Sequence, residues 1–183
     1  MTSMIRRRLL AAAAALPVFP AFAQTRPLTC GELTAQQTEG PFFKTNTPRR
    51  GSLVEPQSKA ARLLVTGQVL SVQCRPVANA LLDFWHADED GEYDTLGFRY
   101  RGHQFTDAQG SYRLQTIVPA EYPGRTRHIH VKVQSPGKRI LTTQLYFRDE
   151  AGNRRDGLYR PALEIRMVGK GAGEGRFDFV VEV

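Results

Sequence analysis

Cysteine and histidine are scarce in this sequence, which limits the metal sites that it can build. Only two cysteines, Cys30 and Cys74, and four histidines occur among 183 residues. No Cys-x-x-Cys spacing is present, and this argues against metal ligation by cysteine. The two cysteines either pair in an oxidising compartment, tying an N-terminal arm to the rest of the chain, or remain buried thiols. The sequence leaves both alternatives open.

Basic helices are missing, and so is any alternation of aromatic and lysine residues. The formal charge is +7 for the whole chain. It falls to +4 when residues 1–23 are left out, because that stretch holds three arginines and no acidic residue. Such a mild balance does not indicate a nucleic-acid partner.

A long hydrophobic run is also absent, apart from a short one at the N-terminus. Three arginines at positions 6–8 precede the alanine-rich run 9–22, and Ala21-Phe22-Ala23 is an A-x-A cleavage site. The run is too short and too rich in alanine for a transmembrane span, although an uncleaved anchor is the alternative. We predict a signal peptide over 1–23, export to the periplasm and no stable membrane association afterwards. The paired arginines resemble a twin-arginine export signal.

No part of the mature chain shows sustained helical periodicity, whereas short β segments alternate with turn signals. With no crossover helix between them, these segments predict an all-β fold, a largely antiparallel β-sandwich with long loops. We expect an N-terminal arm over 24–61 and one sandwich domain over 62–183. The expected strands are 62–70, 79–85, 111–118, 127–134, 139–147, 163–168 and 176–183.

Two histidines, His128 and His130, flank Ile129 in one of these strands. Side chains alternate along a strand, so the two imidazoles share a face about 7 Å apart at Cα. Such a pair either binds one metal ion or is simply a solvated strand face. Tyr122 lies nearby, and a phenol titrates near about 10, so it ionises at neutral pH only beside a highly charged cation. The local pattern therefore predicts a ferric site with mixed His and Tyr ligands.

Six segments together resemble the intradiol ring-cleavage dioxygenases, the family that includes catechol and protocatechuate 3,4-dioxygenases. They lie in the same order and spacing as in that family and span roughly residues 36–150. They are Thr38-Glu-Gly-Pro-Phe42, Phe84-Trp-His-Ala-Asp88 with Gly91-Glu-Tyr93, Thr106-Asp-Ala-Gln-Gly110, Thr116-Ile-Val-Pro119, Tyr122-Pro-Gly-Arg-Thr-Arg-His-Ile-His130 and Thr143-Gln-Leu-Tyr-Phe147.

The resemblance implies a prealbumin-like sandwich that holds one non-haem Fe(III) ion through Tyr93, Tyr122, His128 and His130. Tyr122 and His128 are the implied axial ligands, and a solvent hydroxide completes the site. A catecholic substrate is expected to displace the hydroxide and Tyr122, which accept its protons. O2 then opens the ring between the two hydroxylated carbons, which gives a muconic acid.

Two further residues take roles from the resemblance. Arg125 matches an arginine that stabilises negative charge developing on the substrate ring, and Gln144 matches a residue that supports the substrate side of the pocket. One departure from the family pattern is Pro119-Ala120-Glu121-Tyr122, where relatives usually have Pro-Gly-x-Tyr. The missing glycine changes local backbone freedom and bears on the choice of substrate.

Each assignment has a structural alternative. The two tyrosines are also compatible with a core or corner role, and the alternatives for the whole chain are a non-catalytic binding module or a zinc or copper protein. An anionic substituent on the substrate ring could meet two arginines, Arg99 and Arg101. The alternative is an apolar wall formed by Phe98 and Tyr100. Elsewhere we expect Arg127 at the surface, His86 and His103 in structural or rim positions, Trp85 in the core and residues 88–90 in a solvated turn.

Overall fold

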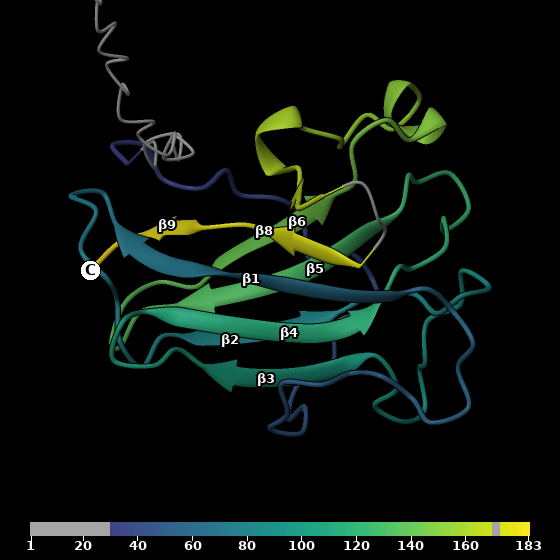
Figure 1. Cartoon of the computed structure of the whole chain (residues 1–183), viewed down its shortest axis with the longest axis horizontal. Helices are drawn as coiled ribbons and strands as arrows, with labels where there is room; N and C mark the ends of the chain where they lie inside the picture. Colours follow the sequence, from purple (N-terminus) through teal and green to yellow (C-terminus); the bar gives the residue numbers. More distant parts are fainter. Residues whose placement is uncertain (1–29, 170–172) are drawn as a thin grey trace, which may run out of the picture.

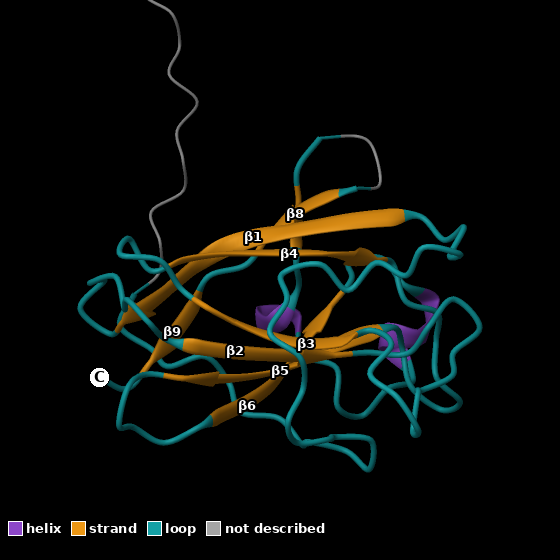
Figure 2. Cartoon of the chain, turned by 90° about the horizontal axis from the view of Figure 1, so that it is seen from below, coloured by secondary structure: helices purple, strands orange, loops and turns teal. Residues whose placement is uncertain are grey.

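Two β-sheets packed face to face make up the molecule, as the sequence predicts (Figure 1). The structure is a computed structural model that describes residues 30–169 and 173–183. Seen from below, β1, β4 and β8 form the upper layer and β2, β3, β5 and β6 the lower one (Figure 2). The predicted signal peptide, 1–23, lies outside the described residues.

The upper sheet has the order β4-β1-β8-β7, with β9 also paired to β1. Its long strands, β1 (Arg62–Ser71) and β4 (Ser111–Ile117), are antiparallel. The short strands β8 (Glu174–Arg176) and β9 (Phe179–Val181) run parallel to β1, and β7 (Arg166–Met167) is antiparallel to β8. The sandwich is therefore largely antiparallel.

The lower sheet has the order β3-β2-β5-β6, and all its pairs are antiparallel. Its strands are β3 (Arg101–Phe105), β2 (Leu81–Trp85), β5 (His128–Gln134) and β6 (Leu141–Tyr146). This sheet carries the histidine pair on β5. The outer face of the sheet, turned away from β1 and β4, is where the site forms.

Strand β3 was not expected from the sequence. Its residues, Arg-Gly-His-Gln-Phe, lack the apolar alternation that identifies a half-buried strand. The strand forms because it is paired on both sides: β2 lies on one side, and on the other Arg50 donates to the carbonyl of His103 (2.9 Å) and His103 to that of Pro48 (3.0 Å). A Cβ on Gly102 would lie 2.7 Å from Arg50 Cγ and 2.8 Å from Leu53 Cδ2, so glycine lets the arm lie close to β3 without displacing these side chains.

The C-terminal third also departs from expectation. The predicted strand 163–168 shrinks to β7, because the chain makes a 3-10 turn, η2 (Pro161–Leu163), that starts with a proline. The predicted strand 176–183 is interrupted at Asp178, whose side chain accepts the amide of Gln68 (2.9 Å), and Val183 is exposed rather than buried. A second 3-10 turn, η1 (Ala151–Arg154), precedes η2. Among the described residues, no helix is long and apolar enough to cross a membrane.

The core lies between the two sheets. On β5, Ile129, Val131 and Val133 are fully buried there, so His128 and His130 point to the opposite face, as the alternation predicts. Side chains from β1, β2, β4, β6 and the C-terminal strands complete the core; among them are Leu63, Val65, Leu82, Phe84, Leu114, Leu145, Phe177 and Phe179.

The N-terminal arm hydrogen-bonds to both sheets. Thr34 donates its amide to the carbonyl of Val180 (2.9 Å), and Gln37 donates to that of Thr142 (2.8 Å). A disulfide joins Cys30 to Cys74 just beyond β1, which settles the alternative that the sequence left open in favour of pairing.

Replacing both cysteines by serine is expected to lower the free energy of unfolding by about 4 kcal/mol, because the bridge closes a loop of 44 residues. Urea denaturation of the wild type and the double variant Cys30→Ser/Cys74→Ser measures the difference. Wild type treated with a reductant should reproduce the variant. Equal unfolding midpoints for all three samples would contradict the expectation.

Candidate metal centre

The two histidines of β5 meet at their ring nitrogens. His128 Nε2 lies 3.1 Å from His130 Nε2, and both residues are almost fully buried. The pairing of β5 with β2 sets Trp85 beside His130, and their rings stack at 4.8 Å between centroids. Trp85 therefore packs against the His130 ring. We had expected it in the main core between the sheets, but it belongs to a separate, smaller cluster.

The tautomer of His128 follows from its neighbour. The carbonyl of Thr126 lies 2.6 Å from Nδ1, and a carbonyl only accepts, so Nδ1 carries the proton. In the neutral ring Nε2 then has a free lone pair directed into the site. Burial lowers the pKa of His128 to about 4, so the ring is neutral at physiological pH.

His130 is held neutral for the same reason. Burial, followed by the nearby His128 and Arg125, keeps its pKa well below the usual value. Gly40 of the arm lies against this ring, because a Cβ there would be 3.4 Å from Cε1, and its backbone has a positive φ of 70°. A glycine at this position lets the arm cover the imidazole closely.

The two predicted tyrosine ligands lie on loops, and one of them, Tyr93, reaches the histidine pair while Tyr122 lies against Tyr93. Tyr93 Oη lies 3.3 Å from His128 Nε2, and the rings of Tyr93 and Tyr122 are 5.7 Å apart. Phe42 of the arm stacks on Tyr93 at 4.4 Å and meets Tyr122 edge-on at 5.3 Å. Tyr93 is buried and Tyr122 only partly so.

Gly91 brings the two tyrosine loops together. Its φ is +84°, and a Cβ on it would lie 2.4 Å from the carbonyl oxygen of Glu121. Only glycine fits there, which explains the Gly-x-Tyr spacing that ends at Tyr93. Ala120, in contrast, has no positive φ, so the alanine that replaces the usual glycine sits without backbone strain.

The donor set fits a hard metal ion. Two ligands about 2.1 Å from a metal at right angles are separated by about 3 Å, and the Nε2–Nε2 and Oη–Nε2 distances are 3.1 and 3.3 Å. Across residues 30–169 and 173–183, no group of three or more His, Cys, Asp or Glu could hold a metal, and the further donors beside the histidine pair are phenol oxygens. Burial raises the pKa of Tyr93 above its ordinary value, so its phenol ionises only beside a cation.

Arg125 and Gln144, both singled out in the sequence, contact each other. Arg125 Nη2 donates to Gln144 Oε1 at 2.7 Å, and Gln144 Nε2 donates to the carbonyl of Thr38 at 2.9 Å. Tyr146 Oη lies 2.9 Å from Gln144 Oε1, and burial raises the pKa of Tyr146 to about 12, which keeps it neutral. Asp156 was not recognised from the sequence, yet it accepts two hydrogen bonds from Arg125 Nε, at 3.0 and 2.9 Å.

The other polar residues considered in the sequence have structural roles. His103 Nδ1 lies 2.8 Å from the carbonyl of Thr47, and Arg127 forms an ion pair with Glu150 (3.2 Å). The prediction of a solvated turn over 88–90 was wrong for Asp88. This carboxylate is buried and accepts the amides of Asp90 and Glu92, at 3.0 and 2.9 Å, so it shapes the loop that leads to Tyr93.

Acid is expected to destabilise the metal-free protein between about pH 6.5 and pH 4. His86 is buried between Thr116 Oγ1 (2.6 Å) and the carbonyl of Ala87 (2.7 Å), and burial lowers its pKa to about 4. The unfolded chain keeps the ordinary value, so it binds the proton first and stability falls with pH across this window. Its share is on the order of 3 kcal/mol.

Urea unfolding of chelator-treated protein at pH 7.5 and pH 4.5 tests this expectation, and His86→Gln should show a smaller difference between the two values. An unchanged pH dependence in that variant would contradict it.

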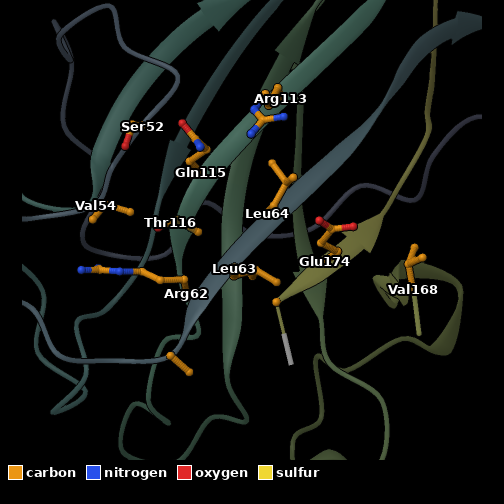
Figure 3. Close-up of a pocket in the computed structure, with 12 residues that line it drawn as sticks. Ser52, Val54, Arg62, Leu63, Leu64, Arg113, Gln115, Thr116, Val168 and Glu174 are labelled. Atoms are coloured by element: carbon orange, nitrogen blue, oxygen red, sulfur yellow. The ribbon is translucent and has the colours of Figure 1, made fainter. Parts of the chain in front are cut away.

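A groove of about 830 Å³ lies on the other sheet, away from the histidines (Figure 3). Arg62 of β1, Arg113 of β4 and Glu174 of β8 are among its walls, and its lining includes no His, Cys or Tyr. The groove therefore offers none of the donors that the metal centre needs.

Comparison with known proteins agrees with this geometry. A family model described as Dioxygenase matches residues 38–161. A chlorocatechol 1,2-dioxygenase of Pseudomonas sp. (strain P51) is 29% identical, over 84% of this chain and 75% of that protein. The catechol 1,2-dioxygenase 2 of Acinetobacter lwoffii is 31% identical, over 75% of this chain and 62% of that protein.

Solved structures resemble the chain as well. The dioxygenase domain of a dioxygenase–carbohydrate-binding protein fusion from the cellulolytic bacterium Streptomyces sp. SirexAA-E is 53% identical, covers 83% of this chain and 99% of that one, and superposes with a TM-score of 0.80. The 3-chlorocatechol 1,2-dioxygenase of Rhodococcus opacus 1CP is 28% identical over 80% of this chain and 71% of that one, with a TM-score of 0.72. The matched family model, the sandwich and these likenesses together show that the chain belongs to the intradiol ring-cleavage dioxygenase family.

Proposed function

We propose that this protein is an Fe(III) dioxygenase that opens a catecholic ring between its two hydroxylated carbons. One O2 is consumed per ring, and both of its atoms enter a muconate-type product. The observation that carries the proposal is the meeting of two neutral imidazoles and one phenol. Nε2 of His128 lies 3.1 Å from Nε2 of His130 and 3.3 Å from Oη of Tyr93, and the ring of the second phenol, Tyr122, lies 5.7 Å from that of Tyr93.

The four proposed ligands are Tyr93, Tyr122, His128 and His130, and the ferric ion would supply the Lewis acidity and electron acceptance that make a chelated catecholate reactive toward O2. Tyr93 and both histidines are buried, so they form the fixed side of the site. Tyr122 is partly exposed on its loop, which suits a ligand that gives way to substrate. Its Oη would be the acceptor for one of the two hydroxyl protons of the catechol.

Arg125 supplies the charge that the reaction needs. Its Nε is held by Asp156 and its Nη2 by Gln144, which leaves Nη1 as the donor available to a substrate. A fixed guanidinium beside the ring stabilises negative charge as it develops and requires no reorganisation at that moment. Gln144 acts through this arginine, because its amide is itself fixed by Thr38.

The charges near the site favour an uncharged catechol as the substrate. Arg125 and Arg101 are the guanidinium groups whose charge acts on His130. Arg125 is already paired with Asp156 and keeps only Nη1 for a substrate, and Arg101 is only 1% exposed and so out of reach of a carboxylate on the ring. Arg99 points to solvent beside Asp88 (3.7 Å) and Asp94 (3.9 Å). A ring carboxylate would therefore lose its hydration and gain at most the Nη1 donor of a guanidinium whose charge is already paired.

Export to the periplasm also belongs to the proposal. The arginines at 6–8 and the Ala21-Phe22-Ala23 site support it, and so does the Cys30–Cys74 disulfide, since such bonds persist in oxidising compartments. The mature protein is expected to begin at Gln24, and N-terminal sequencing of the exported form tests this.

Oxygen uptake by purified, iron-loaded protein tests the activity. The protein should be reddish, because tyrosinate bound to ferric iron absorbs visible light, and it should lose the colour when iron is removed. Catechol should support oxygen uptake, with mass spectrometry showing two atoms of label from ¹⁸O2 in the product. A colourless protein that holds stoichiometric zinc would overturn the proposal in favour of a zinc protein, and an iron-loaded protein inert toward catechols would indicate a binding module.

The same assay tests the substrate charge. We expect kcat/KM for catechol to exceed that for protocatechuate at least about tenfold, which corresponds to about 1.4 kcal/mol. Hydroxyquinol, an uncharged triol, is the control, and it should resemble catechol. Equal values for catechol and protocatechuate would contradict the expectation.

A further inference from the structure

The carboxylate of Asp156 lies where two parts of the candidate site meet. It follows η1 in the sequence, 31 residues beyond Arg125. Its side chain is only 2% exposed. Both oxygens accept from Arg125 Nε, and they also accept the amides of Thr126 (3.0 Å) and Leu158 (2.9 Å). The donors to this carboxylate are therefore either groups of the candidate site (Arg125 and Thr126) or the backbone of the loop on which Asp156 itself lies (Leu158).

The first consequence concerns the direction of the guanidinium. With Nε on Asp156 and Nη2 on Gln144, two edges of the planar group are fixed. Within the described residues Nη1 has no hydrogen-bond partner, and the side chain is 19% exposed. The plane and direction of Nη1 are thus set by the Asp156 carboxylate and the Gln144 amide, with Tyr146 Oη as a longer contact of Nη2 at 3.3 Å. Without the carboxylate, a partly buried guanidinium would turn toward water.

The second consequence concerns His128. The peptide group of Thr126 donates its N–H to Asp156, and its carbonyl accepts from His128 Nδ1 at 2.6 Å. This carbonyl sets the tautomer and the ring orientation of His128. Asp156 therefore acts on the imidazole through one peptide unit, and on the guanidinium directly.

The charge of Asp156 is maintained in the folded protein. Burial opposes ionisation, but the Leu158 amide and Arg125 outweigh it and keep the pKa of Asp156 below its ordinary value. A charged acceptor holds N–H donors more tightly than a neutral one. An asparagine has nearly the same shape but only one acceptor oxygen, so it cannot accept from all of these donors in the same geometry.

We propose that Asp156 is a positioning residue that aims Arg125 Nη1 at the substrate and, through the Thr126 peptide, holds His128 in its ligating orientation. The inference rests on the proposed function and names a member of that site which none of the sequence motifs contains.

Asp156→Asn is the test. Substitution of a residue that orients a metal ligand typically costs about 10–100-fold in affinity or activity, so we expect kcat for catechol to fall about 10–100-fold. KM should change much less, because the guanidinium acts on charge that develops in the transition state. Iron affinity, measured by competition with a chelator, should fall about 10–100-fold. A crystal structure of the variant should show Arg125 turned away from Gln144.

Asp178→Asn is the matched control. Asp178 is a similarly buried carboxylate on the other sheet, paired with Arg166 (3.0 Å) and Arg176 (3.5 Å) and bonded to the Gln68 amide. It should lose similar stability but keep wild-type kcat and iron affinity. Equal losses in both variants would reduce Asp156 to a purely structural role and overturn the inference, as would an Asp156→Asn structure with Arg125 and His128 in place and kcat unchanged.

Two further comparisons keep the inference separate from the proposed function. If Asp156→Asn does not fold, Asp156→Glu takes its place, since it keeps the charge but displaces the carboxylate by one methylene. If the wild type takes up no oxygen, the proposed function fails. The positions of Arg125 and His128 in the variant structure and its iron affinity then still decide whether Asp156 positions them.

Discussion

Replacing His130 by alanine is expected to abolish iron binding, visible colour and oxygen uptake together. The imidazole is one of the four proposed donors, and its Nε2 lies 3.1 Å from Nε2 of the other histidine. Loss of a residue that merely orients a ligand costs about 10–100-fold in metal affinity, so loss of the donor itself should exceed about 100-fold. Without the cation, Tyr93 returns to its protonated form, because burial raises its pKa. Metal analysis, the absorption spectrum and oxygen uptake measure the three effects.

His103→Ala is the control for this variant. His103 lies on β3 of the same sheet, and its Nδ1 is bonded to the Thr47 carbonyl (2.8 Å) rather than directed at the other histidines. It should retain iron, colour and activity while losing some stability. Full iron content and colour in His130→Ala would show that the iron binds elsewhere.

Arg125→Gln is expected to lower kcat about 10²–10³-fold while iron and colour are retained. The magnitude is that of removing one fixed donor to developing negative charge. KM for catechol should change little, because the interaction is made mainly in the transition state. The variant also leaves Asp156 buried without its counter-charge, so its unfolding temperature should fall. Steady-state oxygen uptake well below that temperature separates the kinetic effect from the loss of stability.

Arg127→Gln tests whether the effect belongs to position 125. Arg127 is two residues away on the same segment, but it pairs with Glu150 at 3.2 Å. Its removal should leave kcat within about twofold, because its partner Glu150 belongs to none of the hydrogen bonds that hold Arg125. A similar loss of kcat in both variants would show that Arg125 has no specific role.

The strands that carry the chemistry were predictable because their signals are local. Alternation along β5 sets the histidines on the face opposite Ile129 and Val131, and the structure places them there. The polar strand β3 was missed, since it forms only by pairing with β2 and with the arm. The break at Asp178 was missed too, because its cause is a hydrogen bond to Gln68, 110 residues away.

Within the site, sequence motifs identified residues but not their contacts. The family resemblance marked Arg125, whereas its partner Asp156 lies in no motif and is brought close by the loop after β6. The segment Thr38-Glu-Gly-Pro-Phe42 was singled out by the family resemblance, but nothing in it indicated that Phe42 would stack on Tyr93.

The sequence by itself determined the all-β class, the shared face of His128 and His130, and the family. These properties depend on the two-residue period of a strand and on short motifs, both of which act over a few neighbouring residues. Only the tertiary structure decided that Tyr93 reaches His128, that the arm covers His130, and that Asp156 fixes Arg125. Such contacts join segments tens of residues apart, and they form only when the packing of both sheets brings the loops together.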